Sequence, residues 1–223
     1  MQILNRIYSL FIGSRIMLYT ACIQTIDCIY VLLIKPKFVI YKTLSLIIAI
    51  FTIPLLWSKE KDIETNPAFT YGSTPVFSAY NILKQAGAKS GMTFLDLGSG
   101  RGNLVFVAAL GFEMNSIGIE IQNRHYRISK FIYNLMKNSK VTLLKENFLT
   151  SKLPNADIIF ISNTCFPSFT EILLTKKLEN LKIDTILLSM SAPLLSEKIK
   201  TQAVRTYLFS WGKGTVYFQR IVS

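Results

Sequence analysis

The feature that most constrains this chain is a glycine-rich turn within the sequence "TFLDLGSGRGN", at residues 93–103. Apolar runs stand on both sides of it, as expected where a buried strand passes into a buried helix. Its glycines, at positions 98, 100 and 102, follow the pattern G-x-G-x-G and not the G-x-G-x-x-G of a dinucleotide-binding turn. No G-K-[ST] follows, which excludes a P-loop. The turn therefore predicts a ligand that lacks a pyrophosphate.

Short β-rich runs alternate with helical stretches from residue 59 onward, which is typical of a parallel sheet with crossover helices. We expect strands at 93–97, 116–120, 141–146, 156–162 and 184–190, and helices at 76–87, 102–110, 122–138 and 168–181. Two further runs, 205–211 and 214–222, are joined through glycines and predict a C-terminal antiparallel hairpin. The sequence thus predicts an α/β, Rossmann-like fold with a mostly parallel seven-stranded sheet.

Two acidic residues are expected beside the glycine turn. Asp96 precedes the first glycine, and Glu120 ends the next strand. A carboxylate at the first position can accept hydrogen bonds from an ammonium group, and one at the second can accept them from both hydroxyls of a ribose. S-adenosylmethionine carries both groups. Because open α/β sheets bind ligands at the carboxyl ends of their strands, these residues predict an S-adenosylmethionine site there.

Several motifs resemble those of class I S-adenosylmethionine-dependent methyltransferases. They are "YGSTP" at 71–75, "FLDLGSGRGNLVFVAA" at 94–109, "GIE" at 118–120, "NF" at 147–148, "IFISNTCF" at 159–166 and "FSWGKGTVYF" at 209–218. In this order they are most similar to the non-SET histone-lysine methyltransferases of the disruptor-of-telomeric-silencing family, over about residues 66–220. The chain also resembles the membrane-linked lysine methyltransferases that modify the c subunit of ATP synthase.

This resemblance implies a role for each matching residue. It places Tyr71, Gly72 and Thr74 over the methionine end of the cofactor, and Asp96, Gly98, Gly100 and Glu120 beside the methionine and ribose. Asn147 and Phe148 would flank the adenine, and Asn163 would lie between cofactor and acceptor. Two residues depart from the histone enzymes, because Ser73 replaces a glutamate and Asn147 an aspartate. Histone specificity is therefore the weakest part of the similarity.

Asn163 has two interpretations. It follows a predicted strand, so its amide can orient the methionine end of the cofactor or an incoming amine, which would make it a catalytic residue. It can instead cap the helix that begins after Pro167. The two interpretations differ in kinetics, since loss of a helix cap lowers stability and not turnover.

The N-terminal quarter of the chain is strongly apolar. The run 43–58 has no charge, the run 16–34 contains Asp27 as its only charge, and "KPK" at 35–37 separates the two. This pattern predicts a hairpin of two membrane helices. One spanning helix preceded by an interfacial helix is the alternative, and buried helices of a soluble protein are a third. We expect residues 1–58 to be a membrane-anchor segment and residues 59–223 to be the methyltransferase domain, facing the cytoplasm where the cofactor is.

Charge and composition narrow the class of partner. The formal net charge of +12 suits an anionic membrane surface or an acidic partner, but no nucleic-acid-binding motif organises the basic residues, so nucleic acid is not favoured. Three cysteines without a CxxC pair suggest no metal site. The single histidine, His125, is expected on a solvated helix turn.

The leading hypothesis is a membrane-anchored methyltransferase that acts on a protein amine, in particular a lysine. The alternatives are a methyltransferase for a small or lipidic acceptor and a non-catalytic cofactor-binding module of a membrane complex.

Overall fold

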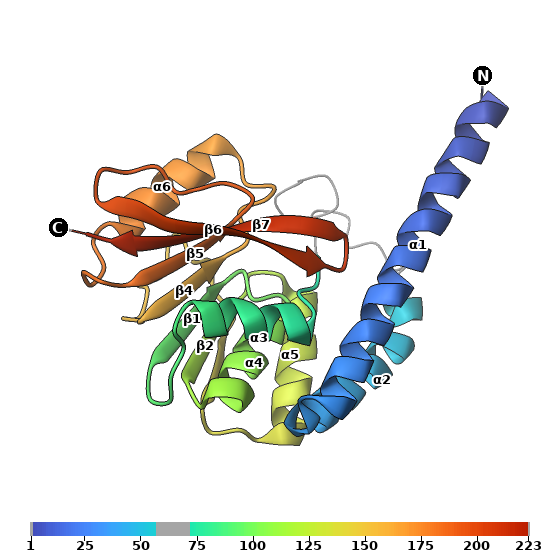
Figure 1. Ribbon diagram of the computed structural model, residues 1–223, viewed down its shortest axis with the longest axis horizontal. Helices are drawn as coiled ribbons and strands as arrows, with labels where there is room; N and C mark the ends of the chain where they lie inside the picture. Colours follow the sequence, from blue (N-terminus) through green and yellow to red (C-terminus); the bar gives the residue numbers. More distant parts are fainter. Residues whose placement is uncertain (1, 57–71, 223) are drawn as a thin grey trace.

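The computed structural model describes residues 2–56 and 72–222, and in these ranges seven strands form one mixed sheet in the order β3-β2-β1-β4-β5-β7-β6 (Figure 1). The parallel strands are β1 (Thr93–Leu97), β2 (Asn115–Ile119), β3 (Val141–Leu144), β4 (Ile158–Ile161) and β5 (Ile186–Met190). The antiparallel strands are β6 (Ile199–Phe209) and β7 (Gly212–Ile221). The predicted mostly parallel sheet with a C-terminal hairpin is confirmed.

Side chains of the central strands alternate between two apolar clusters, one on each face of the sheet. On β1, Phe94 belongs to the first cluster, and Leu95 and Leu97 belong to the second. The first cluster includes residues of α3 (Val76–Gln85), α4 (Asn103–Phe112) and α5 (Asn123–Met136), and the second includes residues of α6 (Ser168–Leu178). Three helices therefore cover one face, and α6 covers the other (Figure 1).

The edge strand β6 begins at Ile199, six residues before the start predicted at 205. Its first half, "IKTQAV", mixes polar with apolar residues and is largely exposed, so it lacks the apolar pattern by which buried strands are recognised. The parallel strands begin or end within a few residues of their predicted bounds.

The N-terminal segment forms two helices, α1 (Gln2–Leu33) and α2 (Val39–Leu56), joined through a short 3-10 helix (Pro36–Phe38). Within the described residues, no single helix is both long and apolar enough to cross a membrane; Met17–Leu33 and Pro36–Ile48 reach that threshold only as a pair, with a bend of 116° between them. The two predicted helices are present, and their sharp bend sets them against the α/β unit.

The bend between these helices is packed into the protein core. Phe38 and Tyr41 are completely buried, in the same apolar cluster as α3 and α4. The Tyr41 ring lies 5.0 Å from that of Phe106, and a Cβ at Gly111 would be 3.1 Å from the Phe38 ring. A glycine at position 111 thus allows the close approach. The inner side of the bend is part of the fold and not a separate appendage.

A buried ion pair fixes the helices to the start of α3. The Lys42 ammonium donates to Asp27 at 2.5 Å, and the other Asp27 oxygen accepts from the backbone N–H of Phe77 at 3.0 Å. Pro75, the residue that precedes α3, has no side-chain group with which to cap it. Asp27 therefore supplies the missing cap from α1.

Candidate active site

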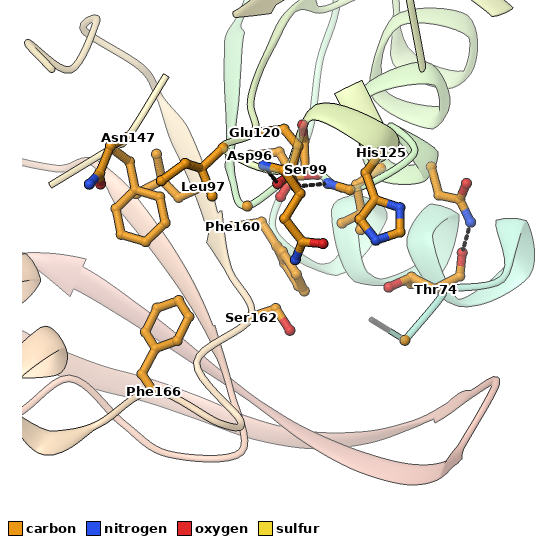
Figure 2. Close-up of a pocket in the computed structure, with 18 of the residues that line it drawn as sticks. Thr74, Asp96, Leu97, Ser99, Glu120, His125, Asn147, Phe160, Ser162 and Phe166 are labelled. Atoms are coloured by element: carbon orange, nitrogen blue, oxygen red, sulfur yellow. Dashed lines mark hydrogen bonds between the residues drawn. The ribbon is translucent and has the colours of Figure 1, made fainter. Parts of the chain in front are cut away.

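A cavity of about 230 Å³ opens at the carboxyl ends of β1, β2 and β4, and we call it the edge cavity (Figure 2). Eight of the predicted cofactor residues line it: Gly72, Thr74, Asp96, Gly98, Gly100, Glu120, Asn147 and Phe148. Tyr71 lies outside the described residues. Loops that follow four different strands or precede α3 thus converge on one hollow.

The glycine turn forms the floor of the edge cavity. Gly98, Gly100 and Gly102 have φ values of +84°, +55° and +85°, a conformation that side chains other than glycine rarely adopt. The N–H groups of Gly98 and Ser99 both donate to the carbonyl of Ile119, at 2.9 and 3.0 Å. The turn is therefore held against the end of β2, with its backbone open to a ligand.

Glu120 clamps this turn from the end of β2. One carboxylate oxygen accepts from the Gly100 N–H at 2.7 Å, and the other accepts from the Gln122 N–H at 2.6 Å. Burial raises the pKa of Glu120, while these backbone hydrogen bonds oppose the rise. Each oxygen keeps a lone pair, so the same carboxylate can also accept from ligand hydroxyls.

Asp96 lies beside Glu120 at the centre of the cavity (Figure 2). It is 2% exposed, and burial, with the nearby Glu120 charge as a second cause, raises its pKa to about 8. Two buried carboxyl groups in contact with one cavity are costly to ionise together. A cationic ligand would remove much of that cost, which makes the part of the cavity beside Asp96 suited to an ammonium group.

The segment 72–74 covers one end of the edge cavity and is held from two sides. The Ser73 backbone N–H donates to the Ser210 hydroxyl at 3.0 Å, and the Ser73 carbonyl accepts from the Ser210 backbone N–H at 3.1 Å. The Thr74 carbonyl accepts from the Asn103 amide at 2.9 Å. A Cβ at Gly72 would collide with the Trp211 indole, so only glycine fits there. The β6–β7 hairpin therefore fixes this cover.

Asn147 and Phe148 stand at the other end of the cavity, in the turn that follows β3. The Asn147 side-chain oxygen accepts from the Leu149 N–H at 2.9 Å, and the Phe148 ring stacks on Phe166 at 5.8 Å between centroids. Figure 2 shows Asn147 and Phe166 at this end, and Thr74 and His125 at the opposite one. The cavity is thus elongated, with a polar end and an aromatic end.

Asn163 is placed differently from the other predicted residues, because it does not line the edge cavity. Its side-chain nitrogen donates to Glu171 of α6 at 3.0 Å and to the Ala192 carbonyl at 3.2 Å, while the preceding Ser162 lines the cavity. The amide therefore links α6 to the loop after β5.

The prediction of a solvated His125 is wrong. The side chain is 7% exposed and lines the cavity from the first turn of α5. Burial, followed by the charges of Arg101 and Arg124, lowers the pKa of His125 to about 4, so the imidazole is neutral at pH 7. The signal in the sequence was its position just after a strand-ending acid, where the first turn of a helix faces the ligand edge.

Other lining residues also went unpredicted as site residues. They include Ser99, Asn103, Gln122, Phe160, Ser162 and Thr170. Of these, only Ser99 and Ser162 are directly adjacent in sequence to a predicted residue, so the strand ends indicate the region of the cavity but not which residues face inward.

The sheet order, the glycine turn and the acid at the end of β2 define a class I S-adenosylmethionine-dependent methyltransferase. Residues 58–208 match the sequence profile of the family described as histone methylation protein DOT1. This match spans more than half of the chain, so the chain belongs to that family and is an S-adenosylmethionine-dependent methyltransferase. No curated protein sequence matches it at a significant level.

Solved structures of low sequence identity share the fold. An RNA methyltransferase from Salinibacter ruber, solved with S-adenosyl-L-homocysteine, has a TM-score of 0.56 at 22% identity; the match covers 68% of this chain and 94% of that one. TrmN from Thermus thermophilus has a TM-score of 0.58 at 17% identity, over 70% of this chain and 52% of its own. A putative methyltransferase from Escherichia coli, yhhF, has a TM-score of 0.56 at 15% identity, over 68% and 88%.

Proposed function

We propose that this enzyme is a membrane-anchored methyltransferase that acts on a lysine side chain of a protein, with its catalytic domain in the cytoplasm. The observation that carries the proposal is the DOT1 family match, whose residues 58–208 include every segment that lines the edge cavity. The family is described by histone methylation, which is the modification of a protein. Ser73, in place of a glutamate, argues for an acceptor other than histone.

The residues of the edge cavity fit S-adenosylmethionine in a definite orientation. Asp96 and the backbone of Gly98 would hold the ammonium and methionine end, beneath Thr74. Glu120 would accept from the ribose hydroxyls, and Asn147 and Phe148 would flank the adenine. The burial of Asp96 in the same cavity as Glu120 supports this orientation, because a cation at that position would offset the cost of ionising both carboxyl groups.

Methyl transfer needs an unprotonated acceptor and a dry approach. When bound, the cofactor would supply a methyl group on a sulfonium. The acceptor nitrogen would form the new bond to carbon and release a proton, and sulfur would keep the electron pair of the bond that breaks. Phe160, Phe166 and Pro167 give the cavity an apolar side near Ser162. Such a wall lowers the pKa of an entering amine by desolvation. In this arrangement Asn163 positions the wall by joining α6 to the loop after β5.

The anchor is proposed to be residues 1–58, and the catalytic domain residues 59–223. The support is the outer surface of α1, α2 and the turn between them, where large apolar side chains are exposed: Met17, Leu18, Ile26, Ile29, Leu32, Leu33, Ile34, Ile40, Leu46 and Ile47. A formal net charge of +12 favours an anionic lipid surface for these helices to meet.

The proposal is tested by incubating the protein with S-adenosylmethionine labelled in its methyl group and with separated membrane and soluble fractions. We expect label in a membrane protein, at the ε-nitrogen of lysine by mass spectrometry. The Glu120→Ala variant serves as the matched negative control, since loss of its hydrogen bonds should weaken cofactor binding by about 1.5–3 kcal/mol. Label found in lipid, or in a soluble small molecule, would instead identify a different acceptor class.

A further inference from the structure

Lys177 makes an unusual set of contacts on the far side of the aromatic end of the edge cavity. This residue lies in the last turn of α6, and its ammonium donates to three backbone carbonyls. The Lys177 nitrogen lies 2.7 Å from the Phe148 oxygen and 2.9 Å from the Leu149 oxygen, and the third carbonyl is that of Ser151. An ammonium has three N–H donors, so these carbonyls use its full capacity.

The three carbonyls converge because residues 147–151 form a compact turn after β3. The Asn147 carbonyl accepts from the backbone N–H groups of Thr150 and Ser151, at 3.0 and 2.9 Å, and the Asn147 side chain accepts from Leu149. Such a helical turn directs its later carbonyls to one side, as at a helix C-terminus, where a lysine is a suitable cap. Lys177 provides that cap from another element.

The same helix also controls the opposite aromatic wall. Phe166 precedes α6 by two residues and stacks on Phe148, and both rings line the edge cavity. One end of α6 thus places Phe166, and the other end holds the backbone of Phe148 through Lys177. The spacing between the two walls depends on both attachments.

We infer that Lys177 is a positioning residue for the cofactor, which acts by holding the turn 147–151 so that Asn147 and Phe148 present a preformed adenine site. The inference rests on the proposed placement of the adenine against these two residues. Lys177 itself does not line the cavity, so its effect on the cofactor passes through the turn. Without the ammonium, the three carbonyls must accept hydrogen bonds from water instead. The loosened segment 147–151 must then be ordered again each time the cofactor binds.

The test compares Lys177→Met with Lys176→Met, which removes the same charge from the adjacent, exposed position of α6. Calorimetry measures the Kd of two ligands that share the adenosine, namely S-adenosyl-L-homocysteine and 5′-methylthioadenosine, which lacks the amino-acid end. We expect Lys177→Met to raise both Kd values by about tenfold, because losing charge-assisted hydrogen bonds lowers both the stability of the turn and its affinity for the ligand. Lys176→Met should leave both Kd values unchanged. The turnover number at saturating cofactor should stay near that of the wild type.

Hydrogen exchange of the backbone amides at 149–151 provides a readout that does not depend on activity. These amides should exchange faster in Lys177→Met, and in Lys177→Gln if the first variant is poorly folded, while amides of β1 keep their wild-type rates. Unchanged exchange, an equal loss in Lys176→Met, or a Kd change for only one of the two ligands would overturn the inference. A wild-type protein that binds neither ligand would overturn the cofactor-site assignment, and this inference with it.

Discussion

At the scale of single residues, the protonation of Asp96 gives the most direct prediction. Its pKa is raised from 3.8 to about 8, so between these values the folded, ligand-free protein holds a proton that the unfolded chain has released. The free energy of unfolding contributed by Asp96 therefore falls as the pH rises through this window. A bound ammonium lowers the same pKa, so we expect cofactor affinity to increase with pH up to about 8.

Calorimetry with S-adenosyl-L-homocysteine between pH 6 and 8.5 measures this dependence, and the use of buffers with different ionisation enthalpies counts the protons released. The Asp96→Asn variant should bind weakly and with a flatter pH profile, and it should lose less stability than the wild type toward pH 8. Any slope that remains reports Glu120, whose pKa burial also raises. A flat wild-type profile would show that Asp96 does not contact the cation.

Asn163 gives a second prediction at this scale. Because its buried amide joins Glu171 to the Ala192 carbonyl, Asn163→Ala should lower stability by about 1–3 kcal/mol, the cost of losing both hydrogen bonds. If it also positions the wall of the acceptor channel, single-turnover transfer at saturating cofactor should slow by on the order of a hundredfold. Melting temperature and transfer rate are measured on the same preparation. A lower melting temperature with a normal rate would leave Asn163 a purely structural role.

At the scale of elements, the site receives a hydrogen bond from the second N-terminal helix. The Tyr41 hydroxyl of α2 donates to Asn103 at 2.6 Å, and the Asn103 amide donates to the Thr74 carbonyl at 2.9 Å. Asn103 and Thr74 line the edge cavity. Tyr41→Phe keeps the ring packed against Phe106 but removes the hydrogen bond to the Asn103 side-chain oxygen, so we expect cofactor Kd to rise by about threefold to tenfold with little change in melting temperature.

The matched control for this prediction is Tyr133→Phe in α5, which removes from a half-buried side chain a hydroxyl that makes no hydrogen bond to the described residues. Its cofactor Kd should equal that of the wild type. If both variants bind alike, the connection from α2 to the cavity has no energetic effect on the cofactor.

The elements also show what the sequence could and could not predict. The parallel strands were predictable because four of them are apolar runs that end in turns, and the cofactor edge followed from Asp96, the glycines and Glu120. The buried His125 was not predicted, since a lone polar residue does not by its type indicate the face of a helix on which it lies; only its position in the first turn after Glu120 indicates the ligand edge. The first half of β6 was not predicted as a strand for a similar reason, because an exposed edge strand need not be apolar.

Contacts between segments far apart in the sequence were the features that the sequence predicted least well. A composition change near residue 60 suggests a boundary, but it cannot show that Phe38 and Tyr41 fill a space beside Gly111, or that Asp27 caps α3. These contacts depend on the 116° bend, which the sequence marks only as "KPK". The long apolar runs thus identified the two helices without distinguishing their buried face from their exposed one.

At the scale of the whole molecule, α1 and α2 have two faces with different expected roles. Ile23, Asp27 and Val31 lie on the buried face of α1, at intervals of one helical turn. A chain that begins near residue 60 would therefore lose part of its core as well as the proposed anchor. Deletion cannot separate anchoring from folding, so the decisive variants must change the exposed face alone.

The paired substitution Ile29→Lys and Leu33→Lys changes side chains of α1 that are 51% and 79% exposed. Two charges on that face should oppose burial in lipid, at a cost of about 2.5–3.5 kcal/mol for each lysine at the centre of a membrane and less near its surface. We expect the wild type to sediment with membranes after a high-salt wash and the paired variant to remain in the supernatant, with unchanged melting temperature and cofactor Kd. Val204→Lys, at a position of β6 that is 46% exposed, is the control and should sediment like the wild type.

Release of the wild type by alkaline carbonate but not by salt would indicate helices that lie in the membrane surface and do not span it. Equal sedimentation of wild type and paired variant would show that this face of α1 does not bind the membrane.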